Sequence, residues 1–187
     1  MSNPEAAAVP SAYTEHYTLI DYQQWLGDWE LVQGSAFAMT PSPSVSHQIT
    51  SVNVVAHLKD KLGGCPHSYA LMETDWEIAN DTVVRPDVLV ICYEPDERIT
   101  KAPVLIFEVI SASTAKRDEQ LKYELYQKEG VKYYGIIYPE KRIAKVYQLI
   151  TGHYQKVGDF TDETSEFKLC GCKIQFDFNL IWRKPRS

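Results

Sequence analysis

The sequence has no long hydrophobic segment, and none of its apolar runs approaches the ~20 residues that a membrane-spanning helix needs. Residues 1–10 also lack the basic start and the apolar stretch of about 7 to 15 residues that mark a secretory signal. We therefore expect a cytoplasmic protein without a membrane partner.

Cysteine and basic residues are both scarce. The four cysteines are Cys65, Cys92, Cys170 and Cys172, of which only the last two are close in sequence. A structural zinc site needs four ligands and commonly a gap of about two to four residues in each pair, so this pattern favours reduced thiols over a metal site.

Lysine and arginine number 19 against 25 acidic residues, a formal net charge of −6. No global field therefore attracts nucleic acid, and DNA binding would need a local basic patch or bound cations.

The composition that is present is that of a folded protein. A chain of 187 residues, 44% hydrophobic and 24% charged, fits one domain that buries about 70% of its unfolded surface. Residues 1–13 combine small side chains with two prolines, so we expect a flexible tail there. Residues 14–187 are predicted to form a single domain.

Apolar periodicity and turn residues predict a mixture of helices and strands. Helices are expected in residues 18–26, in residues 45–62, and from residue 113 or 114 to residue 130. Strands are expected in residues 29–33, 36–40, 68–78, 83–93, 104–110, 133–138, 144–150, 153–157 and 167–178. This order predicts an α/β fold with a central mixed sheet flanked by helices, an additional N-terminal hairpin and additional C-terminal strands.

Two carboxylates lie inside strands that are apolar on both sides. Asp87 occurs in VVRPDVLVI and Glu108 in PVLIFEVI, where an isolated charge is costly to bury. If the two strands form an antiparallel hairpin that pairs Cys92 with Pro103, the same register pairs Asp87 with Glu108. Directly opposite residues have Cα atoms about 4.5 to 5.5 Å apart, so both carboxylates could reach one divalent ion.

Two interpretations of this pair remain open. Each carboxylate could instead neutralise a nearby cation, and Arg85 is the obvious candidate. Two acids in one predicted register favour the metal site, and hard oxygen donors suit Mg²⁺ or Mn²⁺ better than zinc.

The helix that follows Glu108 presents a polar face. Asp118, Lys122 and Tyr126 are spaced four residues apart and so lie on one side of it. An ordinary surface ion pair would explain this spacing, but the helix leaves directly from the Glu108 strand, so Lys122 is expected to point at the acidic pair.

Several segments together resemble one known family. They are Arg85-Pro86-Asp87, the run from Phe107-Glu108 to Thr114, Asp118 with Lys122 and Tyr126, residues 130–134, Trp29-Glu30 to Gly34, and Pro41 to His47. This ordered set is similar to the Uma family of restriction endonucleases, which belongs to the PD-(D/E)XK nuclease superfamily.

The resemblance implies a restriction-endonuclease-like fold and a metal-dependent endonuclease that hydrolyses phosphodiester bonds, with DNA as the expected nucleic acid and a homodimer as a candidate assembly. It implies that Asp87 and Glu108 bind the catalytic Mg²⁺ or Mn²⁺ and that Glu30 completes the acidic set. Ile110 stands where the superfamily has its lysine, so Lys122 on the following helix is the implied replacement.

Other features bear on substrate and activity. Local basic groups, namely Arg85, Lys116, Arg117 and Lys128, are the expected DNA contacts. His47 resembles a recurring family histidine, for which contact with phosphate and a capping or core role are both open. Tyr138 stands where the family usually has aspartate, and with the acidic net charge it favours the alternative of a catalytically silent nuclease-fold module for binding or regulation.

Overall fold

The computed structural model describes residues 15–39, 43–110 and 115–182, apart from the side chains of residues 115–119. The predicted tail of residues 1–13 and the predicted start of the third helix therefore lie outside the described residues. No helix within the described ranges is long and apolar enough to cross a membrane.

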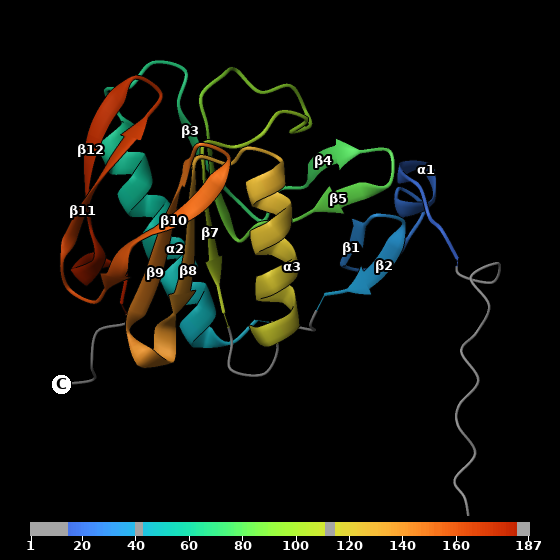
Figure 1. The fold of residues 1–187 in the computed structure, drawn as a ribbon, viewed down its shortest axis with the longest axis horizontal. Coiled ribbons are helices and arrows are strands. Elements are labelled where there is room, and N and C mark those ends of the chain that lie inside the picture. The colour runs from blue at the N-terminus through green and yellow to red at the C-terminus, as the bar shows by residue number, and fades with distance from the viewer. Residues whose placement is uncertain (1–14, 40–42, 111–114, 183–187) are drawn as a thin grey trace, which may run out of the picture.

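Figure 1 shows the helices and strands in chain order. The α-helices are α1 (Leu19–Tyr22), α2 (Val45–Leu62) and α3 (Ala115–Lys128). The strands are β1 (Trp29–Val32), β2 (Ser35–Ala38), β3 (Tyr69–Met72), β4 (Trp76–Ala79), β5 (Thr82–Val84), β6 (Val88–Ile91), β7 (Leu105–Val109), β8 (Tyr133–Tyr138), β9 (Ile143–Ile150), β10 (His153–Phe160), β11 (Thr164–Leu169) and β12 (Cys172–Asp177).

The strands form one large sheet and two smaller ones. The large sheet has six strands in the order β10-β9-β8-β7-β6-β3, and only its β7–β8 pair is parallel. Helix α3 makes the crossover between these two strands, as a parallel connection requires. A four-stranded sheet, β2-β1-β5-β4, and the β11–β12 hairpin lie outside it. The predicted mixed sheet with flanking helices, N-terminal hairpin and C-terminal strands is confirmed.

Three predicted strands are each interrupted. Residues 68–78 divide into β3 and β4, and residues 83–93 into β5 and β6, so each pair of strands is shared between the large sheet and the four-stranded sheet. Pro86 marks the second break, because proline has no N–H for a strand ladder. Residues 167–178 are a hairpin, which turns at Cys170 and Gly171 with φ of 52° and 78°.

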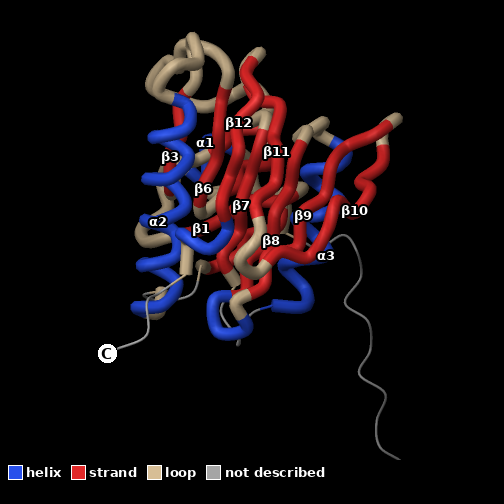
Figure 2. The backbone as a smooth tube through the Cα atoms, turned by 90° about the vertical axis from the view of Figure 1, so that its left-hand side faces the viewer, coloured by secondary structure: helices blue, strands red, loops and turns tan. Residues whose placement is uncertain are grey.

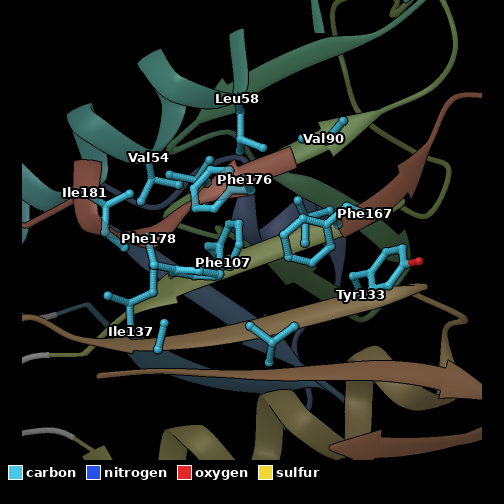
Figure 3. Packing of buried hydrophobic residues seen from close by; sticks show 14 of the residues in the cluster. Val54, Leu58, Val90, Phe107, Tyr133, Ile137, Phe167, Phe176, Phe178 and Ile181 are labelled. Atoms are coloured by element: carbon cyan, nitrogen blue, oxygen red, sulfur yellow. The ribbon is translucent and has the colours of Figure 1, made fainter. Parts of the chain in front are cut away.

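Opposite faces of the large sheet bury different partners. Helix α2 and the β11–β12 hairpin cover the face that carries Val88, Val90 and Phe107, and Figure 2 shows this hairpin in front of the sheet with α2 beside it. In the close view of Figure 3, Phe107 lies among Phe167, Phe176 and Phe178. Helix α3 and the four-stranded sheet cover the other face, where Leu89 and Ile106 point.

The cysteines correct one expectation, since they are paired rather than reduced. Cys65 bonds Cys172, and Cys92 bonds Cys170. The partners are 107 and 78 residues apart in sequence, and they meet because the tip of the C-terminal hairpin packs against the ends of α2 and β6. Sequence spacing could not reveal pairs that only this long-range packing creates.

Candidate functional site

The strands that carry Asp87 and Glu108 have the predicted register. Val88 pairs with Phe107, Leu89 with Ile106 and Val90 with Leu105. Strand β6 begins at Val88, so Asp87 lies one residue before the ladder and directly beside the Glu108 end of β7. Its carboxylate reaches across, and Oδ2 accepts a hydrogen bond of 2.7 Å from the backbone N–H of Val109.

Lys122 of α3 lies between two of the predicted acids. Its Nζ atom is 2.9 Å from Oε1 of Glu30 on β1 and 3.1 Å from Oε1 of Glu108 on β7. The exposed fractions of the three side chains are 13%, 13% and 5%, so this is a buried ion pair rather than a surface one. The expectation that Lys122 points at the acidic residues is therefore confirmed.

Tyr126 supports the same carboxylate from the next turn of α3. Its hydroxyl donates a hydrogen bond of 2.7 Å to Oε1 of Glu108, the oxygen that also faces Lys122. Sequence reasoning placed Tyr126 on the correct helix face but gave it no role. The spacing of four residues from Lys122 was the signal for a shared target.

Arg85 does not neutralise Asp87. Its guanidinium group contacts Asp75 through Nε and Asp28 through a terminal nitrogen, both at 2.6 Å. Its backbone N–H donates to Oε1 of Glu30 at 2.9 Å, which helps to fix that side chain beside Lys122. The alternative in which Arg85 is the buried partner of Asp87 is therefore wrong.

His47 is the side chain that contacts Asp87. It lies in the first turn of α2, which Ser44 caps by accepting a hydrogen bond of 3.1 Å from the His47 backbone N–H. His47 Nε2 is 3.2 Å from Asp87 Oδ1, so His47 and the Val109 N–H hold the two carboxylate oxygens of Asp87 from different sides. The sequence analysis named His47 but did not reveal this contact, which joins α2 to the residue directly before β6.

The pKa values of these groups follow from burial and mutual charge. Burial, together with the charges of Asp87 and Glu30, raises the pKa of Glu108 to about 8 against the opposing effects of Lys122 and Tyr126. Burial alone would lower the pKa of Lys122, but the charges of Glu108, Glu30 and Asp87 outweigh it and raise that pKa. Burial alone would raise the pKa of Asp87, but contact with His47 and the charge of Lys122 lower it. The cluster therefore favours additional positive charge.

The donor chemistry of the pair fits a hard divalent cation. Asp87 and Glu108 offer carboxylate oxygens, and the contacts of Glu108 with Lys122 and Tyr126 both use Oε1, so neither occupies Oε2. Within the described part of the chain, no group of three or more His, Cys, Asp or Glu side chains surrounds one metal position. Two carboxylates suffice for Mg²⁺, which keeps several of its waters and binds substrate phosphate.

The structure describes the side chains of only some of the residues that are predicted to contact DNA. The guanidinium group of Arg85 is held by two aspartates, and Lys128 is exposed beside Glu129 at 3.8 Å. The side chains of Lys116, Arg117 and Asp118 lie outside the described residues. Tyr138 ends β8 and receives a contact of 3.4 Å from Lys145, which joins it to β9.

Comparisons with known proteins relate this chain to one family and to one solved fold. A family model described as "Uma2: Putative restriction endonuclease" matches residues 17–172. The crystal structure of a "putative nuclease belonging to DUF820" from Anabaena variabilis superposes with a TM-score of 0.73 at 15% identity, covering 88% of this chain and 97% of that one. A DrdV–DNA complex gives a TM-score of 0.35 at 14% identity, covering 62% of this chain and 12% of that one. No curated protein matches. The Anabaena structure confirms the restriction-endonuclease-like fold.

Proposed function

The chain belongs to the Uma2 family of restriction-endonuclease-like proteins, and from this premise we propose that it is a metal-dependent endonuclease that hydrolyses phosphodiester bonds of nucleic acid, with DNA as the substrate. The observation that carries the proposal is the convergence of Glu30, Asp87, Glu108 and Lys122. These residues come from β1, the position directly before β6, the end of β7 and α3, and contacts of 2.9 and 3.1 Å join Lys122 to Glu30 and Glu108.

Asp87 and Glu108 are the residues that would hold Mg²⁺ or Mn²⁺. The chemistry that such a cation supplies is polarisation of a phosphate oxygen and activation of a water molecule. Asp87 is prepared for this role because His47 and the Val109 N–H fix its carboxylate. Tyr126 fixes Glu108 in the same way.

Lys122 would act on the phosphate of the nucleic acid or on the attacking water. Its ammonium group can donate to a phosphate oxygen or orient the attacking water, and it places positive charge where negative charge develops. Glu30 holds Lys122 in position, and the Arg85 backbone N–H holds Glu30 in turn. Glu30 thus completes the acidic set by positioning the lysine.

A cleavage assay on several forms of nucleic acid tests this proposal. Supercoiled plasmid, linear duplex DNA, single-stranded DNA and RNA would each be incubated with the full chain, with Mg²⁺, with Mn²⁺, or with chelator. We expect metal-dependent cleavage of at least one DNA form. A folded protein that cleaves none of them with either metal would favour the silent nuclease-fold module instead. The cytoplasmic location and a homodimer stay predictions.

A further inference from the structure

A pocket is lined by residues of α1, β1 and β4 and of the loops next to them. Figure 1 shows where these three elements lie. The volume of the pocket is about 510 Å³, which is within the range of about 300 to 1,000 Å³ of pockets that bind small organic ligands. The lining includes Trp29, directly before Glu30, and Arg85, two residues before Asp87. Glu73, also in the lining, donates its backbone N–H to the Asp87 carbonyl oxygen at 3.2 Å. Backbone N–H groups of two lining residues, Arg85 and Glu73, therefore bond the site residues Glu30 and Asp87.

One side of the pocket is aromatic. Tyr22, Trp25 and Trp29 all line it, and the ring centroids of Trp25 lie 5.6 Å from those of both Tyr22 and Trp29. All three side chains are only half-buried, so part of each ring remains accessible. Aromatic side chains of this kind are the platforms on which nucleobases stack, largely independent of sequence.

The other side of the pocket is polar and carries surplus negative charge. Its charged side chains are four carboxylates and two guanidinium groups, namely Glu73, Asp75, Glu77, Glu97, Arg85 and Arg98. Arg85 contacts Asp75, and Arg98 contacts Glu77, each at 2.6 Å, so the polar atoms are held in place. Surplus negative charge repels a phosphate group. Carboxylates instead accept hydrogen bonds from the amino group of a base, and guanidinium groups donate to its carbonyl and ring nitrogen atoms.

We propose that this pocket binds one unpaired nucleobase that bears an exocyclic amino group, next to a phosphodiester at the candidate site. In a duplex, the faces of a base are covered by stacking and its pairing edge by the partner base, so the aromatic wall is accessible only to a base outside the helix. The inference rests on the proposed function and adds a substrate class to it. The preferred substrate is single-stranded or locally opened nucleic acid.

Binding of labelled oligonucleotides to the full chain in chelator, where metal-dependent cleavage cannot occur, tests the pocket separately from catalysis. The probes are short oligodeoxycytidine, which has the amino group, oligodeoxythymidine, which lacks it, and a hairpin duplex. We expect the order cytidine, thymidine, duplex, from tightest to weakest, measured by fluorescence anisotropy. Trp25→Ala should weaken oligodeoxycytidine binding about tenfold, within the roughly 5- to 150-fold that stacking of one base contributes. It should change duplex binding little.

Two sets of variants distinguish loss of a binding contact in the pocket from loss of folding. Trp25→Phe keeps an aromatic ring and should restore most of the binding, whatever Trp25→Ala does to folding. Glu97→Gln alters the pocket lining, whereas Glu140→Gln alters an exposed glutamate outside it. Only Glu97→Gln should reduce the preference for cytidine over thymidine.

The outcomes separate this inference from the proposed function. Equal binding of single strands by wild type, Trp25→Ala and Trp25→Phe, or a preference for duplex, would overturn the pocket assignment even if the protein cleaves DNA. Single-strand binding that depends on Trp25, in a protein that cleaves nothing with either metal, would support the pocket assignment and contradict the proposed nuclease function.

Discussion

The ammonium group of Lys122 lies 3.1 Å from Oε1 of Glu108, so a helix side chain places positive charge against a carboxylate buried in the central sheet. The position two residues after Glu108 is Ile110, whose backbone N–H continues the pairing with β8 by donating to Ile137 at 2.8 Å. A side chain there is not needed to supply the charge, because α3 returns across the sheet and brings Lys122 to the same carboxylate. Helix and strand together form the site.

Replacing Lys122 should destabilise the fold as well as abolish cleavage. Lys122→Met leaves the buried Glu30 and Glu108 without their shared cation, and loss of one partner of a buried ion pair costs about 3 to 5 kcal/mol. The measurement is the free energy of unfolding in denaturant, without metal. Added Mg²⁺ should raise the melting temperature of this variant more than that of wild type, because a cation replaces part of the lost charge.

Lys173→Met is the matched control, since it removes an exposed lysine of β12. Its unfolding free energy should stay close to that of wild type. Equal stability of the two variants would show that the Lys122 contacts contribute nothing to folding.

Reduction of the disulfides should also lower stability. The Cys65–Cys172 and Cys92–Cys170 bonds close loops of 107 and 78 residues, and a cross-link over about 100 residues stabilises by roughly 4 to 5 kcal/mol in the chain-entropy account. One loop lies within the other, so the effects of the two bonds should not add. Denaturant unfolding with and without a thiol reductant measures the difference. An unchanged midpoint, with four free thiols detected in both samples, would contradict the pairing.

His57 should make stability dependent on pH. Its Nε2 atom accepts a hydrogen bond of 3.0 Å from the Asp177 backbone N–H, which requires the neutral imidazole. Burial, with help from Lys61, lowers the pKa of His57 from its ordinary value of 6.5, despite the opposing charges of Asp177 and Asp60. The unfolded chain thus binds the proton more readily, so this stability is complete above that ordinary value and is lost as pH falls through the lowered pKa.

The test is the melting temperature between about pH 7.5 and pH 5.5, the range in which histidine changes charge. His57→Gln keeps an acceptor for the Asp177 N–H but cannot be protonated. Its melting temperature should fall less over this range than that of wild type. Parallel pH profiles for the two proteins would rule out His57 as the source.

Much of the fold could be predicted from local sequence patterns and from the register of neighbouring strands. The pairing of β6 and β7 followed from reading the two strands as one hairpin, because the register that pairs Cys92 with Pro103 also pairs Val88 with Phe107. The helical spacing of apolar residues between Val45 and Leu62 located α2. The predicted strand of residues 83–93 missed the break at Pro86, although a proline inside a central strand argues against its continuation.

What the sequence could not supply is contact between distant elements. His47 and Asp87 meet because α2 packs across the start of β6, and no local pattern encodes that approach. The disulfide partners and the aromatic pocket depend in the same way on how separate segments pack. For the candidate site, the residue types and the helix face could be predicted, whereas the support by Tyr126 and the Val109 N–H required the structure.

The measurement that tests the central claim most directly is calorimetric titration of the protein with Mn²⁺. It needs no substrate, so it cannot fail through a wrong choice of nucleic acid. We predict saturable binding heat for wild type and for Asp96→Asn, which changes an exposed aspartate, and its loss in Asp87→Asn and Glu108→Gln, each with a retained fold by circular dichroism. Absence of heat for wild type, or equal heat for wild type and Asp87→Asn, would contradict a metal-dependent nuclease site on these two carboxylates.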